Sequence, residues 1–200
     1  MEAHRNAYLA AKEDFENFVS QVIAKLGKTE TDIAGLEVKD CTFRLNRDVR
    51  FSKDKSPYKS NFGAVFAKGG KKSTYAGYYF QLDAEKSFLC GGCWSPEAPD
   101  LKKIRQEIDY NLEDFNRIMR HKKMVSRYAG FEADKDAVLT RPPKGYEPDN
   151  PAIEYLKRKS FVARRYVDDA VLTDRQLTNQ VVSDFQVLSP MIHFINQALL

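Results

Sequence analysis

The sequence predicts a single α+β domain over residues 1–200, in which long helices pack on an antiparallel sheet of four or five strands. Two observations predict this class. Apolar residues recur at helical spacing near both ends and in the middle of the chain, and three aromatic-rich runs separated by short turns follow one another in residues 61–94. No linker, repeat or low-complexity tract divides the chain, and 200 residues suffice for one buried core.

The first segment predicts a helix that ends near Gly27, where a left-handed residue would cap it. Its apolar stripe consists of Tyr8, Phe15, Phe18, Val19, Val22, Ile23 and Leu26. Residues 36–45 then change to alternating apolar and polar side chains, with Cys41, Phe43 and Leu45 on one side. This alternation predicts a strand that runs into the basic segment described below.

Three further strands are expected at residues 61–67, 74–82 and 87–94, joined by the short loops KGGKK and DAEK. Ser95 and Pro96 then occupy the positions of a helix cap and a first helical residue. A second long helix is therefore predicted from there to Ile118, lying on the sheet.

The remainder of the chain predicts a loop, a short helix, a strand and a final helix. Residues 130–151 are rich in loop formers, a short helix runs to Leu156, and residues 161–167 return as a strand. Thr173 and Gln176 have the spacing of a capping box that would open the last helix, which Pro190 kinks or restarts.

Residues 44–59, RLNRDVRFSKDKSPYK, hold six Lys and Arg residues against Asp48 and Asp54, a net charge of +4. The whole chain is also +4, so the rest of the sequence is neutral. Guanidinium groups bind carboxylate or phosphate oxygens in bidentate fashion, and lysines add point charge. We therefore expect an anion-binding surface here. The alternative is a structural network in which the arginines pair with acids such as Glu97 or Asp100.

The direction of the arginines depends on where the strand ends. If the alternation continues beyond Leu45, Arg47 shares the face of Phe43, and Arg44 points the opposite way together with Arg50 and Asp48. If the chain turns near Asn46, all three arginines can converge on one pocket. The candidate ligand-binding residues are Arg44, Arg47, Arg50, Lys53, Lys55, Tyr58, Lys59 and Lys144.

Lys144 is included because a Pro-Gly loop can hold such a side chain at the rim of a site. Its neighbours form a second basic cluster, which acids surround, and a solvated face is favoured for it. The cluster comprises Arg141, Lys144, Lys157, Arg158, Lys159, Arg164 and Arg165.

The motif Arg44-x-x-Arg47-Asp48-x-Arg50-Phe51, followed by Asp54-Lys55 and Tyr58, resembles the signature of a bacterial family of conserved hypothetical proteins, domain of unknown function family 2461. The similarity continues through Asn61-Phe62-Gly63, Gly77-Tyr78-Tyr79, Gly91-Gly92, Trp94, Pro96 and Arg141-Pro142-Pro143-Lys144-Gly145, and so covers most of the chain. Family members usually begin earlier, so we expect Met1 to be an internal start or a trimmed end. The resemblance implies no particular activity.

Cys90-Gly91-Gly92-Cys93 has the spacing of a redox dithiol, but the predicted helix starts after the second cysteine rather than at the first. A packed turn is favoured, since Cys is among the most buried residue types. His4, His121 and His193 show no metal-ligand spacing with the cysteines, so neither a metal nor a cofactor is expected.

The remaining features favour a cytoplasmic protein without membrane contact. No apolar run approaches a membrane span, no secretory signal follows Met1, and three cysteines do not suit a disulfide framework. The sequence does not indicate an oligomeric state.

The function that these observations favour is binding of a small phosphate- or carboxylate-bearing ligand by residues 44–59. An enzyme acting on such a ligand is the alternative, with Tyr58 or Asp48 as the acid or base. A purely structural charge network and weak nucleic-acid binding are the other readings. Weak binding, if any, is expected of nucleic acid, because the neutral remainder of the chain lacks the basic stripe of a duplex binder.

Overall fold

The computed structural model describes residues 5–48, 50, 55–84, 86–131 and 137–200. The chain has the predicted α+β class, with long helices α1, α3 and α8 packed on a sheet of four strands. The strands follow one another in the order β1–β2–β3–β4, and β1 pairs antiparallel with β2. They are β1 (Phe62–Phe66), β2 (Gly77–Leu82), β3 (Phe88–Cys93) and β4 (Phe161–Tyr166).

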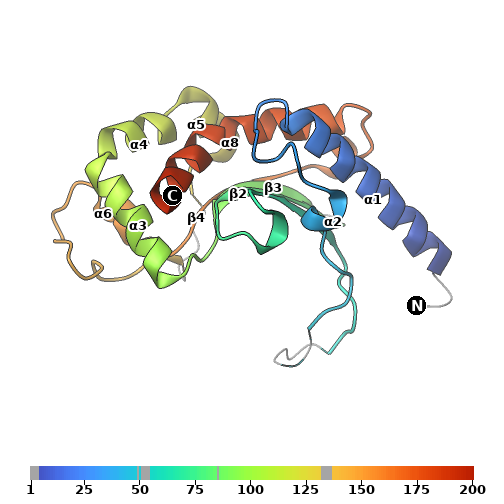
Figure 1. Ribbon diagram of the computed structural model, residues 1–200, viewed down its shortest axis with the longest axis horizontal. Helices are drawn as coiled ribbons and strands as arrows, with labels where there is room; N and C mark the ends of the chain where they lie inside the picture. Colours follow the sequence, from blue (N-terminus) through green and yellow to red (C-terminus); the bar gives the residue numbers. More distant parts are fainter. Residues whose placement is uncertain (1–4, 49, 51–54, 85, 132–136) are drawn as a thin grey trace. The chain divides into compact units, whose positions relative to one another are not determined.

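The helices occupy both ends of the chain and the stretch between β3 and β4 (Figure 1). They are α1 (Arg5–Leu26), α2 (Val38–Cys41), α3 (Ala98–Tyr110), α4 (Leu112–Met119), α5 (Lys122–Tyr128), α6 (Ile153–Leu156), α7 (Asp169–Leu172) and α8 (Leu177–Leu199), with a 3₁₀ turn, η2 (Gly70–Lys72), between β1 and β2.

The chain forms two compact units. The first comprises residues 1–73, 78–89 and 166–183, and the second comprises residues 74–77, 90–165 and 184–200. Their boundaries fall inside β2, β3, β4 and α8, so each of these elements contributes residues to both units. The basic segment belongs to the first unit, and Lys144 belongs to the second.

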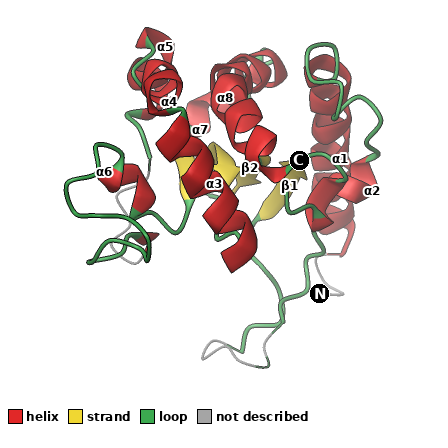
Figure 2. Cartoon of the chain, turned by 60° about the vertical axis from the view of Figure 1, so that its left-hand side comes forward, coloured by secondary structure: helices red, strands yellow, loops and turns green. Residues whose placement is uncertain are grey.

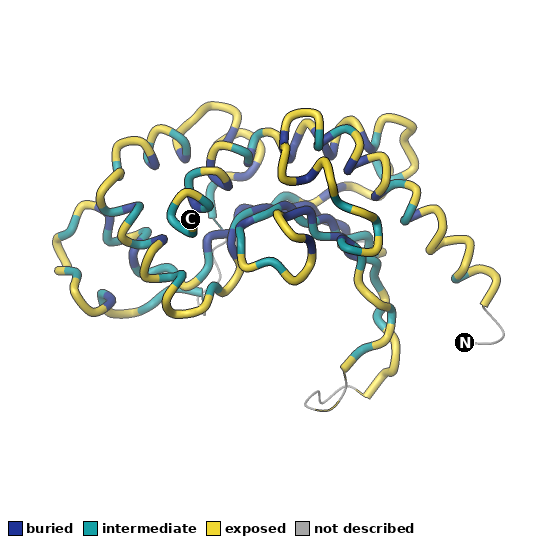
Figure 3. The backbone as a smooth tube through the Cα atoms, viewed as in Figure 1, coloured by how far each residue is buried: buried dark blue, intermediate teal, exposed yellow. Residues whose placement is uncertain are grey.

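In the first unit, α1 packs on the sheet through aromatic side chains. The ring centroids of Phe15 and Phe62 are 5.3 Å apart, and those of Phe18 and Phe80 are 4.8 Å apart. Burial on α1 begins at Phe15, and the preceding residues are mostly exposed (Figure 3). The first turns of α1 therefore leave side chains available next to β1.

The prediction of a left-handed Gly27 was wrong, because its φ is not positive. Gly27 is required for a different reason. A Cβ atom there would lie 2.7 Å from the Cα of Ala34 and 2.8 Å from the carbonyl oxygen of Ile23. The glycine thus allows the chain to return closely past the end of α1.

The predicted strand over residues 36–45 was wrong in its first half, where α2 forms. The backbone N–H of Glu37 donates to the Asp40 carboxylate, and the Glu37 side chain accepts from the Asp40 backbone, which makes a reciprocal cap. Lys71 then donates to the carbonyl oxygen of Thr42 at 2.8 Å, just beyond the helix. These local hydrogen bonds outweigh the alternating pattern, and the chain is extended only from Thr42 onward.

The second unit contains α3, α4, α5 and α6 (Figure 2). The single helix predicted from Ser95 to Ile118 is in fact two helices, because the chain breaks at Asn111. Its start was also predicted wrongly: Ser95 has a left-handed φ of 48°, and α3 begins at Ala98 with Glu97 as its cap.

The last helix, α8, lies against β3 in the second unit. A Cβ atom at Gly91 would lie 2.8 Å from Leu188 Cδ1 and 3.1 Å from Ile192 Cδ1, so the glycine allows close packing. α8 continues through Pro190. The predicted capping box was wrong, since Thr173 ends α7 and the Asp174 carboxylate accepts from the backbone N–H of Gln176.

Candidate functional site

The basic segment forms half of a two-stranded ribbon that extends from the end of α2 and β1 (Figure 1). We call residues 42–47 and 57–64 the basic ribbon. Three backbone hydrogen bonds join its two segments, from Phe43 N to Gly63 O (3.3 Å), from Lys59 N to Leu45 O (3.0 Å) and from Arg47 N to Pro57 O (3.0 Å). The pairing therefore continues past Leu45 as far as Arg47.

The pairing of the ribbon is irregular around Arg44. Thr42 pairs with Ala64 and Asn46 pairs with Tyr58, so two more residues lie between the paired positions on the second segment than on the first, and Leu45 lies at a bend. Simple alternation of side chains therefore does not fix the faces of the arginines. Arg44 lines the pocket described below, whereas Arg47 is not among its lining residues.

Arg50 is bound by the neighbouring acid of the motif. Its Nε donates to Asp48 Oδ1 at 3.0 Å and its Nη2 donates to Oδ2 at 2.6 Å, which is a bidentate pair. These side-chain hydrogen bonds, with the Arg50 backbone N–H, hold the pKa of Asp48 below its ordinary value. The Asp48 carboxylate in turn raises the pKa of Arg50. Both side chains are exposed, so an incoming anion would compete with Asp48 for Arg50.

Arg44 differs from Arg50 in having no such partner. It is exposed, and it forms no ion pair with any residue that the structure describes. The Lys59 ammonium lies 5.4 Å from the ring centroid of Phe43. Lys55 is exposed and Arg47 is half-buried. Lys53 lies outside the described residues.

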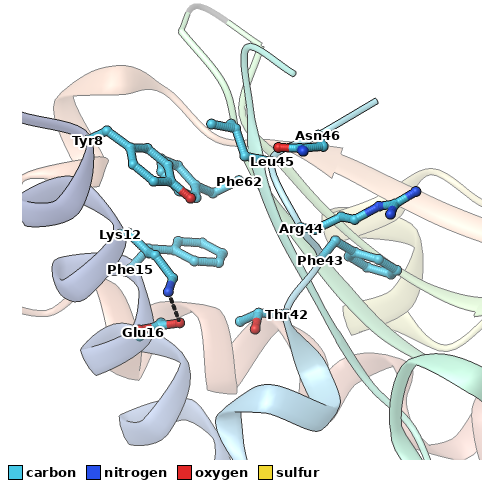
Figure 4. A pocket seen from close by; sticks show the side chains of 10 residues that line it. All are labelled: Tyr8, Lys12, Phe15, Glu16, Thr42, Phe43, Arg44, Leu45, Asn46 and Phe62. Atoms are coloured by element: carbon cyan, nitrogen blue, oxygen red, sulfur yellow. Dashed lines mark ion pairs between the residues drawn. The ribbon is translucent and has the colours of Figure 1, made fainter. Parts of the chain in front are cut away.

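A pocket of about 370 Å³ lies in the first unit, between α1 and the basic ribbon (Figure 4). Of the candidate residues, Arg44 lines it. Its other lining residues are Tyr8, Lys12, Phe15, Glu16, Thr42, Phe43, Leu45, Asn46 and Phe62. The sequence reasoning missed the α1 wall, although Tyr8, Lys12 and Glu16 follow one another at spacings of four, which places them on one helix face.

The two candidate acid–base residues have environments that differ. Tyr58 is 39% exposed on the ribbon, where it pairs through its backbone with Asn46. The lowered pKa of Asp48 makes it a carboxylate at neutral pH and a weaker base than an ordinary aspartate. This environment suits an ion-pair partner better than a proton donor.

The second basic cluster is partly structural. In the second unit, Arg165 pairs with the buried Asp184, and the Arg158 guanidinium lies 4.9 Å from the ring centroid of Phe131. Lys144 is exposed on its loop, next to Gly145 with a φ of 95°. Its predicted contribution to the anion site stays a prediction.

Cys90 and Cys93 lie inside β3 and not at a helix start, and both are buried. Burial raises the pKa of Cys93 to about 11, so its thiol stays protonated at neutral pH. This environment does not suit a redox dithiol, whose attacking cysteine must ionise readily.

We expect the variant with both Cys90→Ser and Cys93→Ser to fold and to keep any anion-dependent stabilisation. Some stability is lost, because buried hydroxyl groups lack the packing of the thiols. In the parent chain, Ellman's reagent should react slowly until guanidinium is added, since the thiols are buried. Fast reaction in the folded state, or loss of anion binding in a folded double variant, would instead indicate a functional dithiol.

Within the described ranges, no three His, Cys, Asp or Glu side chains gather as metal ligands would. Among the helices in the same part of the chain, none has the length and apolar character of a membrane span.

Comparison with protein families identifies the family of the chain. A family model described as a conserved hypothetical protein (DUF2461) matches residues 1–194. The chain belongs to the DUF2461 family. Membership in DUF2461 confirms the resemblance inferred from the arginine motif, and the description of DUF2461 assigns no reaction. No curated protein and no solved structure matches the chain.

Proposed function

We propose that this chain binds a small ligand that carries a carboxylate or phosphate group, and that Arg44 on the basic ribbon is its principal cation. The observation that carries the proposal is the exposed Arg44 guanidinium beside a pocket, which forms no direct ion pair with a carboxylate among the described residues, although its charge contributes to the lowered pKa of Asp48. A guanidinium presents a rigid fork of donors, which matches the oxygens of either anion.

The surrounding charge favours the same ligand class. The described part of segment 44–59 carries five cations, Arg44, Arg47, Arg50, Lys55 and Lys59, against the single carboxylate of Asp48. Such an excess raises the local concentration of anions and their association rate. Asp48 offsets the charge of Arg50 and holds its guanidinium in a fixed orientation, so the other four cations carry the excess.

An enzyme that transforms the same ligand is the alternative. Tyr58 would have to act as the acid or base, because the Arg50 contact lowers the pKa of Asp48, which makes it a weaker base and leaves it no proton to donate at neutral pH. Neither a histidine nor a carboxylate accompanies Tyr58 on the ribbon residues 42–47 and 57–64. We therefore favour binding over catalysis.

Thermal melts with phosphate, sulfate, acetate and nucleotides test the proposal. A ligand at ten times its Kd stabilises the folded state by about 1.4 kcal/mol, which raises Tm by about 3–6 °C for a chain of this size. We expect this rise in the parent and its loss in the variant with both Arg44→Ala and Arg50→Ala.

Arg117→Ala is the matched control. Arg117 is as exposed as Arg50, and its Nη2 also lies 2.6 Å from an aspartate oxygen, that of Asp114 on α4. The control should keep the full anion-dependent rise. Equal rises in the double variant and the parent would contradict the proposal, because the anions would then act elsewhere or through general salt effects.

Nucleic acid should bind weakly and with strong salt dependence, because one basic ribbon is smaller than the surface that a duplex binder usually buries, roughly 600 Å² or more. Fluorescence anisotropy with single- and double-stranded oligonucleotides across a salt series measures this. Sub-micromolar affinity at physiological salt that disappears in Arg50→Ala would show a nucleic-acid-binding protein instead.

A further inference from the structure

The pocket beside Arg44 has an aromatic wall. The rings of Tyr8 and Phe62 are nearly parallel, with an interplanar angle of 9° and centroids 6.1 Å apart, and Phe15 lies 5.3 Å from Phe62. Phe15 is buried, whereas Tyr8 and Phe62 are half-buried and present part of their surface to the pocket. An inorganic anion has no apolar surface that could contact these rings.

The charged side chains of the pocket lie on its two sides (Figure 4). On α1, the Lys12 ammonium lies 3.5 Å from the Glu16 carboxylate, which largely neutralises both. Arg44 stands on the ribbon side, and its guanidinium is directed away from the α1 side chains in this view. Lys12 and Arg44 against Glu16 leave one net positive charge among the lining residues.

We propose that the ligand is an amphiphilic monocarboxylate, whose compact apolar body contacts Tyr8 and Phe62 while its carboxylate binds Arg44. This inference rests on the proposed function and names its ligand class. One net positive charge matches a monoanion, and the Glu16 carboxylate disfavours a phosphate dianion. A volume of about 370 Å³ is at the small end of ligand pockets, which suits a compact body.

Binding requires the Arg44 side chain to change rotamer and turn its guanidinium toward the pocket. Arg44 is exposed and makes no ion pair among the described residues that this movement would break. Rotamer changes of this kind are common when ligands bind. The carboxylate would then lie at the mouth of the pocket, where its second oxygen keeps contact with water.

Four small probes separate the contribution of the ligand's apolar body to binding from that of its charge. Benzoate has both an apolar body and a monoanionic group, acetate lacks the body, benzyl alcohol lacks the charge, and phenyl phosphate is mainly a dianion at pH 7.5. Titrations followed by backbone-amide NMR give a Kd and a location for each probe. Benzoate should bind at least about tenfold tighter than acetate, because burial of several ring carbons contributes well over one factor of ten.

Three pocket variants and a control accompany the titrations. Tyr8→Ala removes a half-buried ring of the pocket and should reduce benzoate affinity toward that of acetate, while Arg44→Ala should weaken both anions. Tyr110→Ala removes an exposed tyrosine of α3 in the second unit and should change neither. Lys12→Met is the third pocket variant, in case Tyr8→Ala folds poorly, and it should weaken benzoate.

The outcomes distinguish this inference from the proposed function. Benzoate shifts confined to residues 8–16, 42–46 and Phe62, lost in Tyr8→Ala and Arg44→Ala, support both. Equal binding of acetate and benzoate, both dependent on Arg44, overturns the amphiphilic ligand but retains anion binding. Benzyl alcohol or phenyl phosphate binding as tightly as benzoate also overturns it. Binding that is unchanged by Arg44→Ala contradicts the proposed function itself.

Discussion

Gly92→Ala is expected to lower the free energy of unfolding by at least about 3 kcal/mol, which combines backbone strain with steric overlap. A Cβ atom at Gly92 would lie 1.8 Å from the carbonyl oxygen of Phe161, and the residue has a φ of 130°. Relief would require β3 and β4 to move apart. Urea denaturation followed by circular dichroism measures the loss, and an insoluble variant would agree with it.

Gly35→Ala is the control for this prediction. A Cβ atom at Gly35 would meet nothing within 4 Å, and its φ is not positive. The substitution should therefore change stability by less than about 0.5 kcal/mol. A Gly92→Ala variant as stable as Gly35→Ala would mean that β3 and β4 are not paired as described.

Asp184→Asn is expected to cost about 2–3 kcal/mol of folding free energy. Asp184 is 1% exposed, and its two carboxylate oxygens accept from Arg127 and Arg165. Removing one member of a buried ion pair typically costs about 3–5 kcal/mol, because the remaining charge loses its partner. The arginines here are 46% and 38% exposed, and solvent screening places the expected cost below that range.

Asp114→Asn provides the comparison, since Asp114 pairs with Arg117 while both are exposed. Exposed ion pairs contribute about 0–1 kcal/mol, so this variant should unfold at nearly the same urea concentration as the parent. Equal losses for the two substitutions would show that burial does not set the strength of the Asp184 interaction.

The strand β2 and the first helix were predictable because their side-chain periodicity agrees with their environment. Residues 77–82 alternate as a half-buried strand does, with Tyr78 and Phe80 buried. Local hydrogen bonds caused the errors elsewhere. The Glu37–Asp40 cap makes a helix where alternation predicted a strand, and the break at Asn111 divides a stretch whose apolar spacing is continuous.

The candidate site was predictable in part. Its charge is concentrated in one segment, so composition alone locates the basic ribbon. The Asp48–Arg50 pair depends on the local backbone, since the Arg50 N–H also donates to Asp48, and the course of the ribbon depends on the pairing of Asn46 with Tyr58. The α1 wall of the pocket could not be predicted, because it requires knowing that Tyr8 packs beside Phe62, more than fifty residues away.

The most direct test of Arg44-centred anion binding is an NMR titration that observes the Nε–H groups of the arginine side chains. On addition of benzoate or phosphate, we predict a saturable shift of the Arg44 signal, while Arg117, which has its own carboxylate partner on α4, stays unchanged. An Arg44 signal that stays in place, or one that moves in parallel with Arg117 without saturation, would contradict the account.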